Sequence, residues 1–174
     1  IYVSDMLERS KRDILMPLVL SDGKILRCDR PAMPTTDCLT KNPLNSGNIL
    51  KLQNICGESG VIAAFNIDEK NTAVFGTISP SDIDGIEGEE FAVYEHFSRE
   101  LKILKKDEKF ELELDSISDY KLYVVVPINN GFAAIGRIDK FISPKTIKAV
   151  IGREVLLYED GEYAVVEDGK LNFK

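Results

Sequence analysis

The sequence predicts a mainly β protein whose larger part is an antiparallel β-sandwich. From residue 49 to the end, about ten short apolar runs follow one another, each bounded by turn residues. Phe110, Leu112 and Leu114 alternate with acidic residues, which indicates a strand with one packed face and one wet face. The Asp-Gly pairs in "EDGE" (159–162) and "EDGK" (167–170) are typical of hairpin turns, so neighbouring strands are expected to be antiparallel.

Residues 1–48 follow a different pattern. "IYVSD" (1–5) has the character of a buried strand. Ser10 is a plausible N-cap for a helix through residues 13–15, and Pro17 is expected to end that helix. The stretch from 25 to 48 is irregular and rich in proline, which is typical of a functional loop or a linker.

A strand followed by a helix is the repeat unit of an α/β barrel or of a doubly wound sheet. Periodicity alone leaves two interpretations of residues 1–48 open. They form either a decorated edge of the sandwich or the last β/α unit of a (β/α)8 barrel. Because the composition changes near residue 48, we predict one domain piece at 1–48 and a sandwich domain at 49–174.

The composition narrows the classes of function. The chain has 174 residues, of which 44% are apolar and 29% charged, and its net charge is −7. This charge argues against a nucleic-acid partner, since phosphate binding needs a concentrated basic patch. No apolar run approaches the roughly 20 residues that a membrane-spanning helix needs. We therefore expect a cytoplasmic protein that has no membrane partner.

The three cysteines, Cys28, Cys38 and Cys56, do not indicate a metal site. Their spacing matches no zinc pattern, and the chain has one histidine to complement them. An odd number of cysteines is also a poor disulfide framework. We interpret them as small buried apolar side chains in a reducing compartment, and we expect no metal and no cofactor.

Few residues have a pattern that points to chemistry. His96 lies within "FAVYEHF", a strand pattern, so a packed or wet-face histidine is favoured over a catalytic base. Asp5, preceded by Ser4, follows the apolar strand at the start of the chain. In a barrel the carboxyl ends of the strands hold the active site, but Ser-Asp is also a good helix cap, and both interpretations stay open.

Several stretches, taken in order, resemble the raffinose synthase and alkaline α-galactosidase group within family 36 of the glycoside hydrolases. They are "IYVSD", "LVLSDGKILRCDRPAMPTTDCL", "NPLNSGNILKLQN", "GVIAAFN", "GTISPSDIDGI", "FAVYEHFS" and "FAAIGRIDKFISPKTI". The resemblance is colinear and covers roughly residues 1–150. It implies a (β/α)8 barrel followed by a smaller C-terminal sandwich, with "IYVSD" as the eighth barrel strand.

The same resemblance implies retaining hydrolysis of α-galactosides of the raffinose type, or galactosyl transfer. The two catalytic aspartates of the family lie upstream of the "IYVSD" match. No residue of this chain is therefore expected to be catalytic, and the chain alone is expected to be inactive while it supports the barrel. Ser4 and Asp5 are the expected substrate-binding residues, and Arg27 and Arg30 are expected near the pocket rim. The expected partners are the α-galactoside, the rest of the catalytic domain and, as a further option, a second copy.

Two alternatives remain from the sequence, a separate carbohydrate-binding module and a purely structural sandwich. Sugar-binding modules usually expose aromatic rings in a line. Tyr94, Tyr123, Tyr158 and Tyr163 are the candidates, although each has a strand pattern in which core packing is equally expected.

Overall fold

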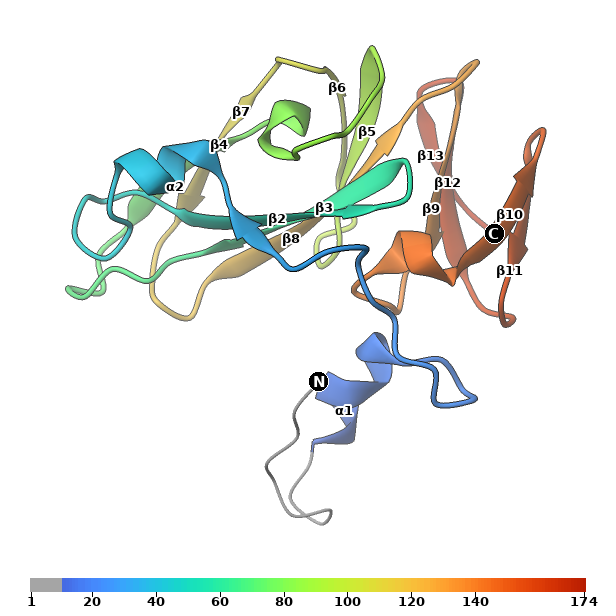
Figure 1. The fold of residues 1–174 in the computed structure, drawn as a ribbon, viewed down its shortest axis with the longest axis horizontal. Helices are drawn as coiled ribbons and strands as arrows, with labels where there is room; N and C mark the ends of the chain where they lie inside the picture. Colours follow the sequence, from blue (N-terminus) through green and yellow to red (C-terminus); the bar gives the residue numbers. More distant parts are fainter. Residues whose placement is uncertain (1–10) are drawn as a thin grey trace.

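The computed structural model describes residues 11–174 (Figure 1). The strand predicted at residues 1–5, with Ser4 and Asp5, and the N-cap predicted at Ser10 lie outside the described residues. The helical elements are α1 (Arg12–Leu15), η1 (Met16–Leu18), α2 (Thr36–Thr40), η2 (Pro80–Asp82) and η3 (Ser143–Thr146). The strands are β1 (Met33–Pro34), β2 (Leu50–Cys56), β3 (Ser59–Phe65), β4 (Val74–Ile78), β5 (Glu90–Glu95), β6 (Leu101–Lys105), β7 (Phe110–Leu114), β8 (Tyr120–Pro127), β9 (Phe132–Arg137), β10 (Ile147–Ile151), β11 (Glu154–Leu157), β12 (Tyr163–Glu167) and β13 (Lys170–Phe173).

A six-stranded antiparallel sheet in the order β1-β2-β3-β8-β5-β6 forms the centre of the molecule. Its middle strand, β8, is apolar on both faces because both faces are covered. Tyr123 and Val125 belong to one hydrophobic cluster, and Val124 and Val126 belong to another. The alternation of side chains along a strand divides the apolar run of β8 between the two clusters.

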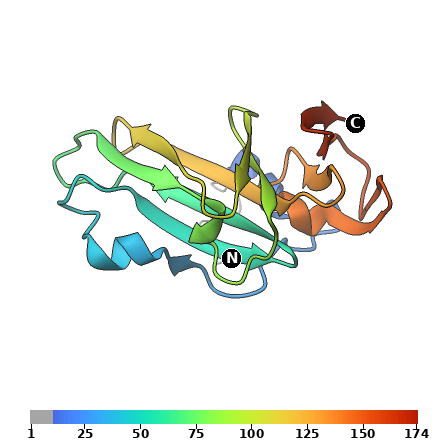
Figure 2. The same ribbon diagram turned by 90° about the horizontal axis from the view of Figure 1, so that it is seen from above.

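Smaller sheets cover the central sheet on both faces, which confirms the predicted antiparallel β-sandwich. The β4–β7 pair contributes Val74, Ile78 and Leu114 to the first cluster, and β9 and β12 contribute Ile135 and Val166 to the second. The β13-β12-β9 sheet in turn packs its far face against the β10–β11 pair through a third cluster. Figures 1 and 2 show β9 to β13 gathered at one end of the molecule, away from β4 and β7.

One of the two predicted Asp-Gly hairpins is confirmed and the other is wrong. Asp168 (φ 48°) and Gly169 (φ 80°) form the turn between the paired strands β12 and β13. This is the left-handed conformation that two-residue hairpin turns need. At residues 159–162, in contrast, the chain crosses from β11, which pairs with β10, to β12, which pairs with β9. The segment is held by Arg137, whose Nη1 donates to the Asp160 carbonyl at 3.0 Å.

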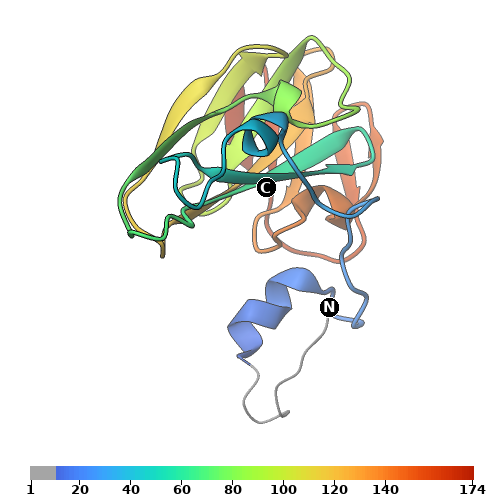
Figure 3. The ribbon, with the colours of Figure 1, turned by 60° about the vertical axis from the view of Figure 1, so that its left-hand side comes forward.

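The first described residues form an extended segment that lies beside the sandwich, as Figures 1 and 3 show. We call residues 11–32 the strap. The predicted short helix is present as α1, and Pro17 lies in the 3-10 turn that ends it. The turn predicted at residues 21–24 is present too, closed by the Gly23 N–H to the Leu20 carbonyl at 2.9 Å. The strap then continues into β1, which pairs with β2.

Gly136 in β9 offers a test of how tightly η3 packs on the sandwich. It has φ +99°, and a Cβ there would lie 2.1 Å from the Ser143 carbonyl oxygen, whereas Gly152 (φ +63°) has nothing within 4 Å. Gly152→Ala should cost about 1 kcal/mol, the cost of a left-handed alanine. Gly136→Ala should cost about 3 kcal/mol or more, because η3 must also move. Equal losses of unfolding free energy in urea titrations would contradict this packing.

Candidate functional site

The residues predicted for the substrate pocket are only partly within the described chain. Ser4 and Asp5 lie outside it, so their substrate-binding role stays a prediction. Arg27 is exposed on the strap. Arg30 is engaged, since its Nη2 donates to the Asp84 carbonyl and lies 3.4 Å from Gln53 Oε1. Arg30 thus ties the strap to β2 and to the loop after η2.

A buried lysine holds the start of the strap against the sandwich. Lys140 follows β9 and is 3% exposed. Its Nζ donates to the backbone carbonyls of Met16 at 2.8 Å and Val19 at 2.6 Å. Carboxylates of Asp139 (3.7 Å) and Glu159 (4.0 Å) offset its charge. A buried ammonium without such partners would be strongly unfavourable, so Lys140 requires the strap to be in place.

Arg137 organises the carboxylates around Lys140. Its Nε and Nη2 donate to the two oxygens of Asp139 at 2.8 Å each, and its Nη1 pairs with Glu159. Glu159 also accepts a hydrogen bond from the strap N–H of Ser21 at 2.6 Å. This hydrogen bond, together with the charge of Arg137, lowers the pKa of the Glu159 carboxyl. Glu159 is therefore ionised at neutral pH and binds the strap directly.

A second set of contacts holds the other end of the strap. The Asp29 N–H donates to the Ile55 carbonyl at 2.9 Å, and the Asp29 carboxylate accepts from the Gly57 N–H at 2.5 Å and from Lys145. Asn54 Nδ2 donates to the Arg30 carbonyl at 2.5 Å. The hydrogen bond from Lys145 lowers the pKa of Asp29. The strap therefore runs antiparallel along the end of β2.

Lys51 is the corresponding buried cation inside the sandwich. It is 2% exposed, and its Nζ lies 2.8 Å from both the Thr77 carbonyl and Asp82 and 3.2 Å from Asp37. The alternating pattern of residues 49–55 gives no sign that Lys51 is buried. Its face of the strand is covered by α2 and η2, and they come from distant parts of the sequence. The burial of Lys51 and Lys140 was therefore not predicted from the sequence.

Several of the residues that make these contacts lie in the stretches of sequence on which the family resemblance was based. Lys140, Lys51, Asp82 and Asp29 come from four different stretches that are far apart along the chain. We call the following set of contacts the strap junction. Lys140 and Glu159 contact the strap backbone, and Arg137 binds the carboxylates of Asp139 and Glu159. Asp29, which lies on the strap, contacts Gly57 and Lys145. The strap junction joins the strap to the sandwich by polar contacts, and a strap held in this way has a defined direction where it leaves the sandwich.

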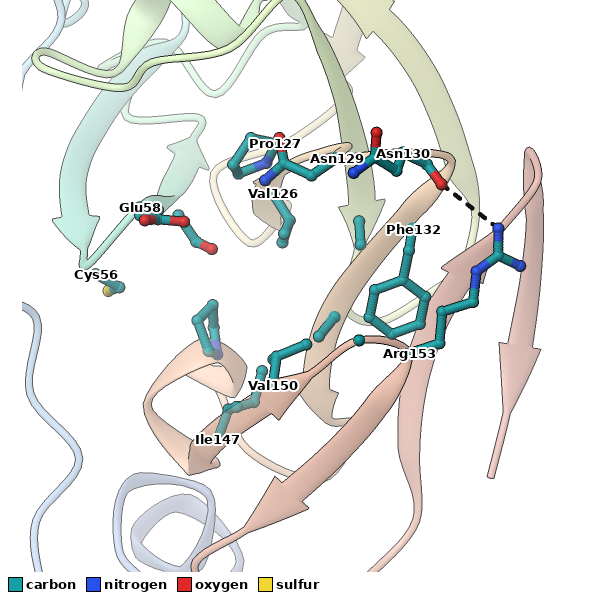
Figure 4. A pocket seen from close by; sticks show the side chains of 15 residues that line it. Cys56, Glu58, Val126, Pro127, Asn129, Asn130, Phe132, Ile147, Val150 and Arg153 are labelled. Carbon is teal, nitrogen blue, oxygen red and sulfur yellow. Dashed lines mark hydrogen bonds between the residues drawn. The ribbon is translucent and has the colours of Figure 1, made fainter.

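A pocket of about 480 Å³ lies between the β2–β3 turn, the β8–β9 turn and β10 (Figure 4). Glu58, Asn129 and Asn130 line one side and Phe132 and Val150 another, with further lining from Cys56, Ser59, Val126, Pro127, Ala133, Ala134, Pro144, Ile147, Gly152 and Arg153. Figure 4 shows Asn130 joined to Arg153, whose Nη2 lies 3.4 Å from the Asn130 carbonyl.

The residues that line the pocket do not include the pair of carboxyl groups that glycoside cleavage needs. Glu58 is the single carboxylate among the described residues that line it. Retaining glycosidases need two carboxyl groups about 5–5.5 Å apart. Arg153 is also neutralised, because it forms a bidentate pair with Asp168 at 2.8 and 3.0 Å. The polar side chains left to a ligand are therefore the amides of Asn129 and Asn130, the Ser59 hydroxyl and the Glu58 carboxylate.

The histidine and tyrosine predictions have mixed outcomes. His96 lies just after β5 and packs against the rings of Phe97 (4.9 Å between centroids) and Phe141 (5.3 Å), as the packed interpretation predicted. Tyr94 and Tyr123 are 0% and 5% exposed in opposite hydrophobic clusters, so they cannot stack on a sugar. Tyr158 is 49% exposed, and Lys24 Nζ lies 4.2 Å from its ring centroid.

The described residues 11–174 show neither a metal-binding cluster nor a membrane-spanning helix. Within this range no group of three or more His, Cys, Asp or Glu side chains is placed to hold a metal ion. Within the same range no helix is long and apolar enough to cross a membrane.

Comparisons with known proteins identify relatives for most of the chain. Residues 1–164 match a family described as raffinose synthase or seed imbibition protein Sip1. A galactinol–sucrose galactosyltransferase from Oryza sativa subsp. japonica is 38% identical over 164 residues, which cover 78% of this chain and 21% of the rice protein. Stachyose synthase from Pisum sativum is 30% identical over 178 residues, which cover 84% of this chain and 21% of the pea protein. The chain thus spans about a fifth of the length of these two relatives.

Among solved structures, the matches are more distant. A protein from Bacillus halodurans described as a candidate α-N-acetylgalactosaminidase is 15% identical, with 46% of this chain and 18% of that chain covered and a TM-score of 0.39.

The strap junction can be tested by replacing its buried cation. Lys140→Met leaves the Val19 carbonyl unpaired at a cost of about 1–3 kcal/mol, and the Met16 carbonyl keeps only the Val19 N–H, at 3.4 Å. Strap opening should therefore become easier, and tryptic cleavage after Lys24 and Arg27 should accelerate about tenfold or more. Lys148→Met, on the exposed side of β10, removes the same charge and one tryptic site and should leave the rate unchanged. Equal rates for the two variants would contradict the junction.

His96 should make stability depend on pH. Its Nδ1 is buried and has no hydrogen-bond partner in the described part of the chain, and burial lowers its pKa. As the pH falls, His96 is protonated in the unfolded chain before it is protonated in the folded chain. The free energy of unfolding is therefore highest above about pH 6.5 and decreases as the pH falls below this value. Glu95, Arg99 and Asp139 also act on this pKa, but they are unchanged in the variant His96→Gln. In urea titrations between about pH 8 and pH 5.5, wild type should lose more unfolding free energy than the variant, and parallel pH profiles would refute this.

Proposed function

The chain belongs to the raffinose synthase or seed imbibition protein Sip1 family, and on this premise we propose that it is the C-terminal sandwich part of an enzyme that processes α-galactosides. The family resemblance inferred from the sequence is confirmed by the match over residues 1–164. The relatives are galactosyltransferases and a stachyose synthase by name. The proposed substrate class is accordingly the raffinose-type oligosaccharides, processed with retention at the galactose.

The proposal assigns the catalytic aspartates to a separate barrel and none to this chain. Two facts support this division. The chain corresponds to about a fifth of each of the two relatives. The pocket described above has Glu58 as its one carboxylate within the described residues, so it lacks the pair that retaining chemistry needs. The chain alone is therefore proposed to be inactive.

The strap junction is the observation that carries the proposed role. Lys140 fixes the backbone of η1 and the residue after it, and Glu159 and Asp29 fix the strap further along. We propose that the strap is the continuation of the last barrel strand. The sandwich then holds that strand end in place, so that Ser4 and Asp5 face the substrate pocket. This proposal keeps the predicted division between residues 1–48 and the sandwich at 49–174. The contacts of the strap junction join the two parts.

A second candidate function is a separate carbohydrate-binding or structural sandwich. The observation that favours binding is the pocket beside Asn129 and Asn130, whose amides match the hydrogen-bonding needs of sugar hydroxyls. The burial of Tyr94 and Tyr123 removes two of the four proposed stacking platforms. We therefore rank this function second.

Activity assays separate the two functions. The 174-residue chain should release no product from an aryl α-galactoside or from galactinol with sucrose, while a protein carrying the proposed barrel ahead of it should turn over at least one of them. Turnover by the chain alone would overturn the assignment of the catalytic pair. In a raffinose titration followed by NMR, sub-millimolar binding that Asn129→Ala weakens would favour the binding module.

A further inference from the structure

Two of the three cysteines meet where the strap runs along the end of β2. Cys28 lies on the strap and Cys56 ends β2, and their sulfur atoms are 3.3 Å apart. The hydrogen bond from the Asp29 N–H to the Ile55 carbonyl brings the strap alongside the last residues of β2. A disulfide has an S–S distance of about 2.05 Å, so the two sulfur atoms need to approach each other by only about 1.3 Å.

The two thiols differ in their surroundings. Cys56 donates its S–H to the sulfur of Cys28. This hydrogen bond, and the positive charge of the nearby Lys145, lower the pKa of Cys28. The same hydrogen bond, together with burial, raises the pKa of Cys56. Cys28 is thus the better nucleophile, because the thiolate is the reactive form, and Cys56 keeps its proton.

The pair is also accessible to a small reagent. Cys28 is only partly buried, and Cys56 lines the pocket beside Glu58, as Figure 4 shows. The third cysteine differs in this respect. Cys38 Sγ accepts from the Lys51 N–H at 3.2 Å and donates to the Ile49 carbonyl at 3.3 Å, so its sulfur is occupied by backbone groups.

We propose that Cys28 and Cys56 are a thiol–disulfide exchange site that reacts with small-molecule disulfides, such as oxidised glutathione, and that the resulting bond ties the strap to β2. The Cys28 thiolate attacks one sulfur of the reagent, whose S–S bond breaks and releases one thiolate. Cys56 then loses its proton and attacks the Cys28 sulfur, which releases the second thiolate. Two cysteine thiols are oxidised, one disulfide is reduced, and the two protons end on the two released thiols.

The disulfide would add a covalent anchor to the strap junction. In the reduced state the strap is held near this point by polar contacts of Asp29, Arg30 and Asn54, with which water can compete. A bond between residues 28 and 56 closes a loop that contains β1 and α2, and such a loop restricts the unfolded chain. A thiol reductant reverses the reaction, so the strap has a reduced state and an oxidised state with different anchoring.

To locate the disulfide by peptide mapping, Cys38 must first be removed. Trypsin does not cleave between Arg30 and Pro31, so Cys28 and Cys38 fall in one peptide. The Cys38→Ser protein, whose hydroxyl can replace both backbone contacts, is therefore treated with excess oxidised glutathione, alkylated and digested. We expect a peptide pair linked through Cys28 and Cys56, and an upward shift in Tm of about 5 °C or more that dithiothreitol reverses. Wild type should show the same shift.

Single-thiol variants complete the test. Cys56→Ser should stop at the first step, with glutathione on Cys28 and no gain in Tm, and Cys56→Ala serves if the serine variant does not fold. In wild type, alkylation of Cys28 and Cys56 as fast as that of Cys38 after oxidant treatment would overturn the proposal. A bond between Cys28 and Cys38, identified by fragmentation of the shared peptide, would overturn it equally.

Discussion

The cover on both faces of the central sheet is the constraint on which the rest of the structure depends. Because apolar layers pack against each face, a polar side chain on these strands is taken out of water and needs partners. Lys51, Gln53 and Glu95 are all buried, and each finds a charged or amide partner nearby. These partners are Asp82 in η2, Asp84 in the loop after η2, and Lys121 in the neighbouring strand β8. The polar contacts that hold the outer segments are therefore a consequence of how completely the sheet is covered.

This constraint also explains what could be predicted from the sequence and what could not. Strand positions follow from local apolar alternation, and the Asp168-Gly169 turn follows from local backbone chemistry, so both were predictable. The "EDGE" segment has the same local chemistry, but a distant residue, Arg137, holds it between two sheets. Lys51 lies in a strand with a regular alternation, and only the packing of distant segments makes its face a buried one.

The candidate site was less predictable than the fold for the same reason. A single lysine after a strand, such as Lys140, has no local signal that separates it from a solvated residue. Its role follows only from the three-dimensional structure, in which the strap backbone lies beside its ammonium group. Ser4 and Asp5 could be proposed from a motif, whereas Lys140 and Glu159, which hold the strap that follows them, lie more than about 130 positions further along the chain.

The two parts of the molecule are held by different physical forces, and this fits the proposed role. The sandwich is stabilised by three apolar clusters, which are insensitive to charge. Within the strap, Leu20 and Leu26 are buried, while Ile14 is 57% exposed, so apolar burial alone holds it weakly. Its position depends on hydrogen bonds from the strap to Lys140 and Glu159, and on those of its own Asp29 to the sandwich. Such bonds fix the orientation of the strap more than they add stability. Under the proposed function the strap carries the end of a barrel strand in one direction, which requires attachment of that kind, and the exposed Ile14 is apolar surface that the proposed barrel would cover.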